Sequence, residues 1–311
     1  DPDYFDLLAS NQKQSIPTSP MLYDPIQGIC GIGRYALESL SHGPFEGLAK
    51  KTALALVALS QPFQHKGRSV PGWFLSPHDP LNVRHRSLCP NGTFNLGLAH
   101  GVTGILAYLA ISWLKGIQVE GHKEAMQRIS SWIRSKALIV NGAYLWPHQI
   151  SWEEEIEGRV GVMQGPKDAW CYGVPGIART LFLAAKALQD DALRSFALDA
   201  YRGIFSRTQV EWNLPGPTIC HGIAGLTLLT YEMAKECEDL KPKMTELETA
   251  LLSFYQVGTP WGFQDVESCR HGKSCKLNKP GFLEGAAGVI LTLSSISTSS
   301  INWHLPLLIH E

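Results

Sequence analysis

The sequence repeats a Gly-x-x-Gly step five times, and each copy is followed by an apolar stretch with helical periodicity. The copies occupy residues 28–31, 101–104, 173–176, 222–225 and 285–288. Their closing glycines are 73, 72, 49 and 63 residues apart, so the repeat is too long and too uneven for a solenoid of short units. The pattern favours a ring of helical units, each beginning at a Gly-x-x-Gly step.

Further apolar segments with helical periodicity lie between these copies, at residues 45–59, 123–137, 191–205 and 244–255. The alternation of two kinds of helix predicts an all-α fold with an inner and an outer layer. Residues 144–151 alternate weakly between apolar and polar side chains, which predicts a short hairpin or an edge strand. No Pro-rich or Ser-rich linker divides the chain, so a single domain over residues 1–311 is expected.

Cysteine and histidine side chains stand at matching offsets just before several of the steps. If the helix N-termini face a common axis, these side chains converge there. Two thiolates and one imidazole suit Zn²⁺ and leave a fourth position open, as in catalytic zinc sites; the set is Cys171, Cys220 and His221. The alternative is that the glycines only permit close helix packing and that the cysteines are buried and inert.

A rival cluster of metal-binding side chains lies at residues 269–275, where Cys269, His271 and Cys275 occur together. The stretch is basic and polar, which favours an exposed surface loop, with a redox-labile cysteine pair as an alternative to a metal site. The remaining cysteines lack a partner at matching spacing and are expected to be buried and inert, namely Cys30, Cys89 and Cys237.

Charge and hydropathy exclude several classes of protein. The chain has 27 Lys and Arg residues against 28 Asp and Glu residues, a net charge of −1, which gives no basic surface for a nucleic acid. No apolar run is long enough for a transmembrane helix, and the first residues do not resemble a signal peptide. The seven cysteines are widely spaced and form no recognisable disulfide framework, which predicts a reducing, cytoplasmic compartment.

Taken in order, the motifs resemble those of the lanthionine synthetase C-like cyclases, most closely the nisin and subtilin type. The resemblance spans nearly the whole chain and rests on residues 23–35, 98–101, 170–176, 220–222 and 282–285. It implies an α/α toroid in which a ring of inner helices lies inside an outer ring. Family toroids have seven inner repeats and five are found here, so we expect a chain truncated at its N-terminus.

The resemblance also implies a reaction and a cofactor. The reaction is the addition of a peptide cysteine thiol to dehydroalanine or dehydrobutyrine, which forms the thioether ring of a lantibiotic. One zinc ion per chain is implied, and the positions that match the family's zinc ligands are Cys171, Cys220 and His221. Other active-site positions match at Asp24, His100 and Tyr172, while Lys167 stands where the family has an arginine. Lysine keeps the charge but loses the bidentate fork.

The chemistry assigns a role to each of these positions. The enolate that forms after thiol attack must be protonated, and His100 is the natural acid. Asp24 either orients that histidine or caps the helix that follows Pro25, and both interpretations remain open here. Tyr172 or Lys167 would stabilise the enolate oxygen.

Two other functions remain as alternatives. One is a zinc-bearing protein of the same family that binds thiols or peptides without cyclase turnover, which would not need His100. The other is a prenyltransferase or a related toroidal zinc enzyme, which fits less well because its ligands include a carboxylate and lack the adjacent Cys-His pair. The partners implied by the resemblance are a dehydrated lantibiotic precursor peptide, a dehydratase and an ABC transporter at the inner face of the membrane.

Overall fold

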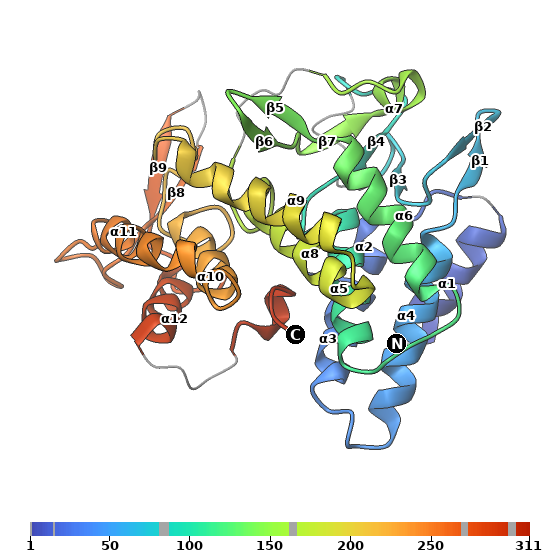
Figure 1. The fold of residues 1–311 in the computed structure, drawn as a ribbon, viewed down its shortest axis with the longest axis horizontal. Coiled ribbons are helices and arrows are strands. Elements are labelled where there is room, and N and C mark those ends of the chain that lie inside the picture. Colours follow the sequence, from blue (N-terminus) through green and yellow to red (C-terminus); the bar gives the residue numbers. More distant parts are fainter. Residues whose placement is uncertain (1, 15, 81–86, 162–166, 269–272, 298–302) are drawn as a thin grey trace.

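The computed structural model describes residues 2–14, 16–80, 87–161, 167–268, 273–297 and 303–311, and it is mostly helical (Figure 1). Its α-helices are α1 (Pro2–Lys13), α2 (Pro20–Tyr23), α3 (Ile29–Leu37), α4 (Pro44–Leu59), α5 (Val102–Leu114), α6 (His122–Ser135), α7 (Trp152–Glu157), α8 (Val174–Leu188), α9 (Asp191–Arg202), α10 (Ile223–Ala234), α11 (Lys241–Leu252) and α12 (Ala286–Ser297). Short 3-10 helices follow at η2 (Gly203–Ser206), η3 (Glu238–Leu240) and η5 (Leu305–Leu307). Among the described residues, no helix is long and apolar enough to cross a membrane.

Five of the helices, α3, α5, α8, α10 and α12, begin directly after the first glycine of a Gly-x-x-Gly step. Consecutive members of this set contact each other in the order α3, α5, α8, α10 and α12. Helices α5, α8 and α10 are buried on almost every side and carry apolar residues all around, as expected of a helix without a solvent-facing stripe. These helices form the predicted inner layer.

A second set of helices covers the first from outside. Helices α4, α6, α9 and α11 pack on α3, α5, α8 and α10 respectively, and α1 packs on α4. Helices α6 and α9 bury one face and expose the other, which is typical of an outer helix. The prediction of two alternating kinds of helix is confirmed, and the four predicted outer segments each coincide with one of these helices.

The glycine pairs are required because each loop folds back onto the first turn of the helix that it precedes. A Cβ atom on the second glycine would lie 2.4 Å from the carbonyl oxygen of Pro25 at Gly31 and 2.7 Å from that of Trp170 at Gly176. Gly173 has a φ of +102°, and its Cβ would lie 1.6 Å from the Lys167 oxygen. Close backbone approach therefore explains the glycines, and the same approach fixes the side chains that precede them.

The strands are short, and within the described ranges they pair antiparallel in four small sheets. The sheets are β1 (Phe63–His65) with β2 (Arg68–Val70), β3 (Phe74–Leu75) with β4 (Thr93–Asn95) and β7 (Gln149–Ser151), β5 (Leu138–Val140) with β6 (Ala143–Leu145), and β8 (Asp265–Ser268) with β9 (Ser274–Leu277). The segment 144–151 thus contributes to two sheets, because β6 pairs with β5 whereas β7 is an edge strand beside β4. The predicted edge strand is confirmed, and a hairpin within this segment is not formed.

The last described segment, residues 303–311, lies in the middle of the molecule between α3, α8 and α10 (Figure 1). Its residues Leu307, Leu308 and Ile309 are almost completely buried. Two buried arginines of the inner helices hold its backbone: Arg34 donates to the carbonyl oxygen of Leu305, and Arg179 to that of Ile309 at 2.7 Å. The C-terminal segment therefore fills space that the inner helices surround.

Candidate functional site

Backbone hydrogen bonds link the loops before the inner helices into one continuous chain. The N–H of Leu98 donates to the carbonyl of Cys171 at 2.9 Å, and the N–H of Cys171 donates to the carbonyl of Cys220 at 3.2 Å. The N–H of Cys220 in turn donates to the carbonyl of Leu283 at 2.9 Å. The side chains just before α5, α8, α10 and α12 are thereby brought to one end of the inner layer, as the sequence predicted.

The two cysteines of the predicted zinc site are in direct contact. The thiol of Cys220 hydrogen-bonds to Cys171, and this bond, with the charge of Lys167, lowers the pKa of Cys171 although burial raises it. The same bond, followed by burial, raises the pKa of Cys220, whose side chain also hydrogen-bonds to His221. The structure therefore places Cys171 beside Cys220 and Cys220 beside His221, whereas the third donor atom that lies within 4.8 Å of both Cys220 and His221 belongs to Glu284 and not to Cys171.

Two residues that the sequence analysis missed support His221. The carboxylate of Asp265, at the start of β8, lies 3.3 Å from Nε2 of His221 and has no solvent exposure. Lys279 donates to Asp265 Oδ2 at 3.0 Å. Burial tends to raise the pKa of Asp265, but the bonds from His221 and Lys279 outweigh it and lower this pKa to about 2. The hydrogen bond that His221 donates to Asp265, followed by its bond to Cys220, raises the pKa of His221 to about 9.

Glu284, in the loop before α12, offers a further donor atom at the site. A carboxylate oxygen of Glu284, the thiol of Cys220 and a ring nitrogen of His221 all lie within 4.8 Å of one another. Glu284 is exposed, however, and its carboxylate accepts a hydrogen bond from Lys279 at 3.0 Å. Thiols suit zinc better than this ion-paired carboxylate, so the chemistry of the donors, though not their present spacing, fits Zn²⁺ on the predicted set of Cys171, Cys220 and His221.

The predicted acid, His100, is held by Asp24. Nδ1 of His100 lies 2.6 Å from Oδ2 of Asp24, which is completely buried. The other oxygen, Oδ1, accepts from the N–H groups of Ile26, Gln27 and Gly28 at 2.9, 2.7 and 3.2 Å. One oxygen of Asp24 thus orients the histidine, as predicted, and the other caps the turn of residues 24–28 before α3, whereas the N-cap of the helix itself is Gly28. His100 follows Leu98 closely, so the bond from Leu98 to Cys171 places it beside the cysteine loop.

Tyr172 and Lys167 line a hollow of about 620 Å³ together with Cys171 and His221. Nδ2 of Asn95 donates to the Tyr172 hydroxyl at 2.9 Å, so the hydroxyl keeps its own proton for donation. Burial is the main cause that raises the pKa of Tyr172 to about 12, which keeps it protonated at neutral pH. All of the predicted active-site residues therefore lie at this end of the molecule.

His148 and Asn95 also belong to this region, although the sequence analysis did not single them out. The His148 ring lies 4.8 Å from the Tyr172 ring, centroid to centroid, and lines the same hollow. Asn95 lies at the end of β4, and its Oδ1 accepts from the N–H of Gly97. The aromatic segment 144–152 was an available signal for His148, whereas no local pattern marks Asn95.

The rival metal cluster is not supported. Cys275 on β9 is disulfide-bonded, which removes its thiol as a metal ligand. The other members of the cluster, Cys269 and His271, lie outside the described residues. Of the cysteines expected to be buried, Cys30 and Cys237 are buried and free, whereas Cys89 is free but partly exposed, so the burial prediction is wrong for Cys89.

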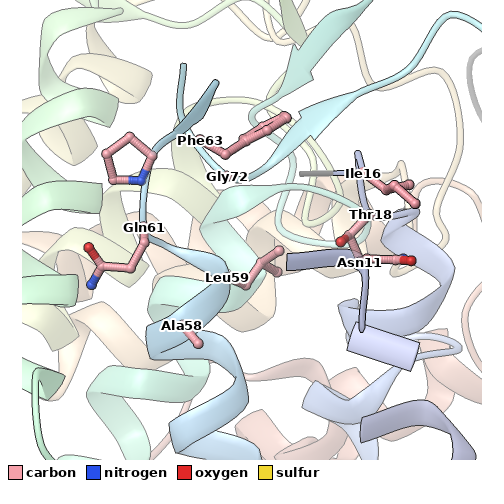
Figure 2. Close-up of a pocket in the computed structure, with 9 residues that line it drawn as sticks. Asn11, Ile16, Thr18, Ala58, Leu59, Gln61, Phe63 and Gly72 are labelled. Atoms are coloured by element: carbon pink, nitrogen blue, oxygen red, sulfur yellow. The ribbon is translucent and has the colours of Figure 1, made fainter. Parts of the chain in front are cut away.

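A second hollow, shown in Figure 2, lies between α1, α4 and β1. Its volume is about 80 Å³. Among the described residues that line it there is no cysteine, histidine or charged side chain; the lining is Asn11, Ile16, Thr18, Ala58, Leu59, Gln61, Pro62, Phe63 and Gly72. Of these two hollows, the one beside Cys171 has the side chains suited to acid, base or metal chemistry, and this second hollow does not.

The fold and the thiol and imidazole site together define a class of protein. Residues 3–308 match the family model described as lanthionine synthetase C-like protein, and the chain belongs to this family. This assignment confirms the resemblance carried by the sequence motifs.

A sequence relative and a solved structure both agree with this family assignment. The chain is 25% identical over 297 residues to the nisin biosynthesis protein NisC of Lactococcus lactis subsp. lactis, covering 94% of this chain and 66% of the relative. It thus spans slightly less than two thirds of that protein's length. The structure matches that of nisin cyclase with a TM-score of 0.77 and 24% identity, covering 96% of this chain and 70% of the other. The fold is that of an α/α toroid, as predicted.

Proposed function

We propose that the protein is a lanthionine-forming cyclase that adds cysteine thiols of a dehydrated peptide to dehydroalanine or dehydrobutyrine. The observation that carries this proposal is the pairing of His100 with Asp24 at 2.6 Å, beside a loop that contains two contacting thiols. A protein that only binds thiols needs the cysteines and the imidazole of His221. It does not need a second histidine held by a buried carboxylate.

The residues that would hold one zinc ion are Cys171, Cys220 and His221. When bound, the ion would act as a Lewis acid that deprotonates a coordinated thiol at neutral pH. The carboxylate of Asp265 fixes the orientation of the His221 ring by binding Nε2 of that ring, which leaves Nδ1 for the metal. A carboxylate behind a ligating histidine is the usual support for such a ligand.

His100 would supply the proton that completes the addition. A carboxylate can only accept, so Nδ1 of His100 carries the proton directed at Asp24, and Nε2 donates when the ring is the doubly protonated imidazolium, whose charge Asp24 offsets. The thiol releases its proton to water as its sulfur attacks the β-carbon, which forms the new C–S bond and moves the electron pair of the double bond into an enolate. Transfer of the Nε2 proton to the α-carbon then yields the thioether and leaves His100 neutral, and a proton from water restores the imidazolium.

Tyr172 and Lys167 would stabilise the enolate oxygen before protonation. The Tyr172 hydroxyl is an available donor because Asn95 occupies its lone pair from the other side. Lys167 contributes a positive charge in the same hollow. Donors placed at a developing oxyanion typically contribute the largest single part of such a rate enhancement.

For the partners, we propose a dehydrated lantibiotic precursor peptide as substrate. The family resemblance supports a dehydratase and an ABC transporter at the inner face of the membrane as further partners, and a cytoplasmic location. The hollow beside Cys171 is lined by the acidic groups Glu267 and Glu284 as well as by Lys167. Such mixed charge suits a peptide with polar and basic side chains better than a small apolar ligand.

The experiment that tests the proposal follows ring formation in a dehydrated nisin-type precursor peptide by mass spectrometry, after alkylation of the remaining free thiols. The protein should reduce the number of alkylated thiols, and His100→Ala should retain zinc and peptide binding while the initial rate falls by about 10²–10⁴-fold. Because thioethers also form slowly without an enzyme, the initial rate and the product stereochemistry are the quantities to compare. Peptide binding without any acceleration by the unmodified protein would instead support the binding function without turnover.

A further inference from the structure

Two histidines of the C-terminal segment meet a buried carboxylate at the opposite end of the inner helices. Glu232 lies in the last turn of α10, whereas Cys220 and His221 precede the first turn of that helix. The side chains of His304 and His310, from the segment in the middle of the molecule, approach Glu232. The cluster is therefore separate from the thiol site by the length of α10.

The geometry of this cluster is that of a metal-binding set. Nδ1 of His310 lies 2.8 Å from Oε2 of Glu232, and Nε2 of His304 lies 3.4 Å from Oε1. One ligand atom from each of the three residues lies within 4.8 Å of the others. Two imidazoles and one carboxylate form a ligand set that transition metals, Zn²⁺ among them, bind with positions left for water.

His304 provides an independent indication of a missing ligand. Its exposed fraction is 4%. Within the described residues its Nδ1 makes no hydrogen bond, and its Nε2 has only the 3.4 Å ion-pair contact with Glu232. Buried polar atoms without a hydrogen-bond partner are rare in proteins because the lost hydration is not replaced. The nitrogen that faces Glu232 has the position of a metal ligand, and a bound cation would remove the penalty.

Two cations already contact the carboxylate of Glu232. Lys235 lies 2.6 Å from Oε1, but its side chain is 42% exposed, so it can turn into water at little cost. Arg179 lies 3.7 Å from Oε2, and its Nε is already bonded to the carbonyl of Ile309. Lys235 is therefore a competitor that a metal ion can displace, while Arg179 can remain in place.

We propose that Glu232, His304 and His310 bind one divalent transition-metal ion of the Zn²⁺ class, which fastens the C-terminal segment to α10. The site is distinct from the thiol site and does not depend on the proposed cyclase activity. Its occupancy bears on the thiol site through the segment itself, because the carbonyl of Leu307 accepts a hydrogen bond from Nε1 of Trp170, the residue before Cys171.

Cobalt binding by the full chain separates the two sites. In metal-free Cys220→Ser, where the thiol site is disabled, Co²⁺ should bind with one equivalent per chain and give a spectrum without thiolate charge transfer. His310→Gln, a change at a partly exposed residue, should raise the cobalt Kd at least about tenfold, since even indirect partners of a ligand are worth 10–100-fold. Lys235→Met should lower it, because a competing cation is removed.

The control is His42→Gln, which alters an exposed histidine whose side chain, among the described contacts, is bonded only to its neighbour Ser41. Its cobalt Kd should equal that of the parent Cys220→Ser protein. Hydrogen exchange reports on the segment: amides of residues 303–311 should exchange more slowly with cobalt than without it. The inference is wrong if Cys220→Ser binds no cobalt, if the bound cobalt shows thiolate bands, or if His310→Gln leaves the Kd unchanged.

Discussion

Replacing Asp24 separates its two roles, because each carboxylate oxygen serves a different partner. In Asp24→Asn the amide oxygen can still accept the N–H groups of Ile26, Gln27 and Gly28. The NH₂ group then faces Nδ1 of His100 in place of an acceptor, so the ring must accept at Nδ1 and cannot become a stable imidazolium. The cap is kept and the orientation of the acid is lost.

The structure gives different magnitudes for the two losses. Asp24→Asn should lower the initial rate of ring formation by about 10²–10⁴-fold, the range of a general acid and of other carboxylate-to-amide changes behind a catalytic histidine. Asp24→Ala should in addition lower the free energy of unfolding by about 2 kcal/mol, the upper end for a lost cap. A larger loss is not expected, since Ile26 and Gln27 are exposed and water can reach their N–H groups.

The assay combines initial rates, zinc content and urea unfolding for the two variants. Zinc content should be unchanged in both, because Asp24 contacts none of the three proposed ligands among the bonds of the described residues. An Asp24→Asn protein with the unmodified rate would show that Asp24 is a cap only. A loss of stability in Asp24→Asn equal to that in Asp24→Ala would show that the amide does not replace the carboxylate as a cap.

Four further substitutions test the surroundings of the site. Asp265→Asn should raise the zinc Kd by about 10–100-fold in chelator competition, whereas Glu284→Gln should leave it unchanged; equal effects would contradict the ligand assignment. Nη2 of the buried Arg207 lies 2.7 Å from the carboxylate of Asp168 in the unmodified protein and loses this counter-charge in Asp168→Asn. Urea unfolding should show that the free energy of unfolding falls by about 3–5 kcal/mol. Cys275→Ser should leave the zinc content at the thiol site unchanged, and zinc loss in that variant would return the rival cluster to consideration.

Much of the inner layer could be predicted from the sequence because its signals are local. A Gly-x-x-Gly step fixes the start of a helix, and its two glycines are needed where the loop folds back on that helix, as at Gly173 and Gly176. The side chains just before the step inherit a defined position from the same loop. Residues at the same offset from the step therefore occupy corresponding positions in neighbouring loops, which is why Cys171 lies beside Cys220.

The support of these side chains could not be predicted, because it comes from segments without a repeat. Asp265 and Lys279 lie on and after the β8–β9 hairpin, and nothing in their local sequence indicates that they meet His221. The place of the C-terminal segment was also missed. A signal was available there, since Arg34 and Arg179 are the buried cations of otherwise apolar inner helices and needed buried acceptors.

The residues of the candidate site are divided between two pairs of loops before the inner helices. The proposed metal ligands come from the loops before α8 and α10, whereas the proposed acid and its carboxylate come from the loops before α5 and α3. The backbone bond from Leu98 to Cys171 joins these two halves at 2.9 Å. Because buried N–H and carbonyl groups must be paired, this bond keeps the loop of Cys171 beside the loop that carries His100. Side-chain substitutions in either half should therefore change chemistry or metal binding separately, as expected of a site assembled from repeated loops.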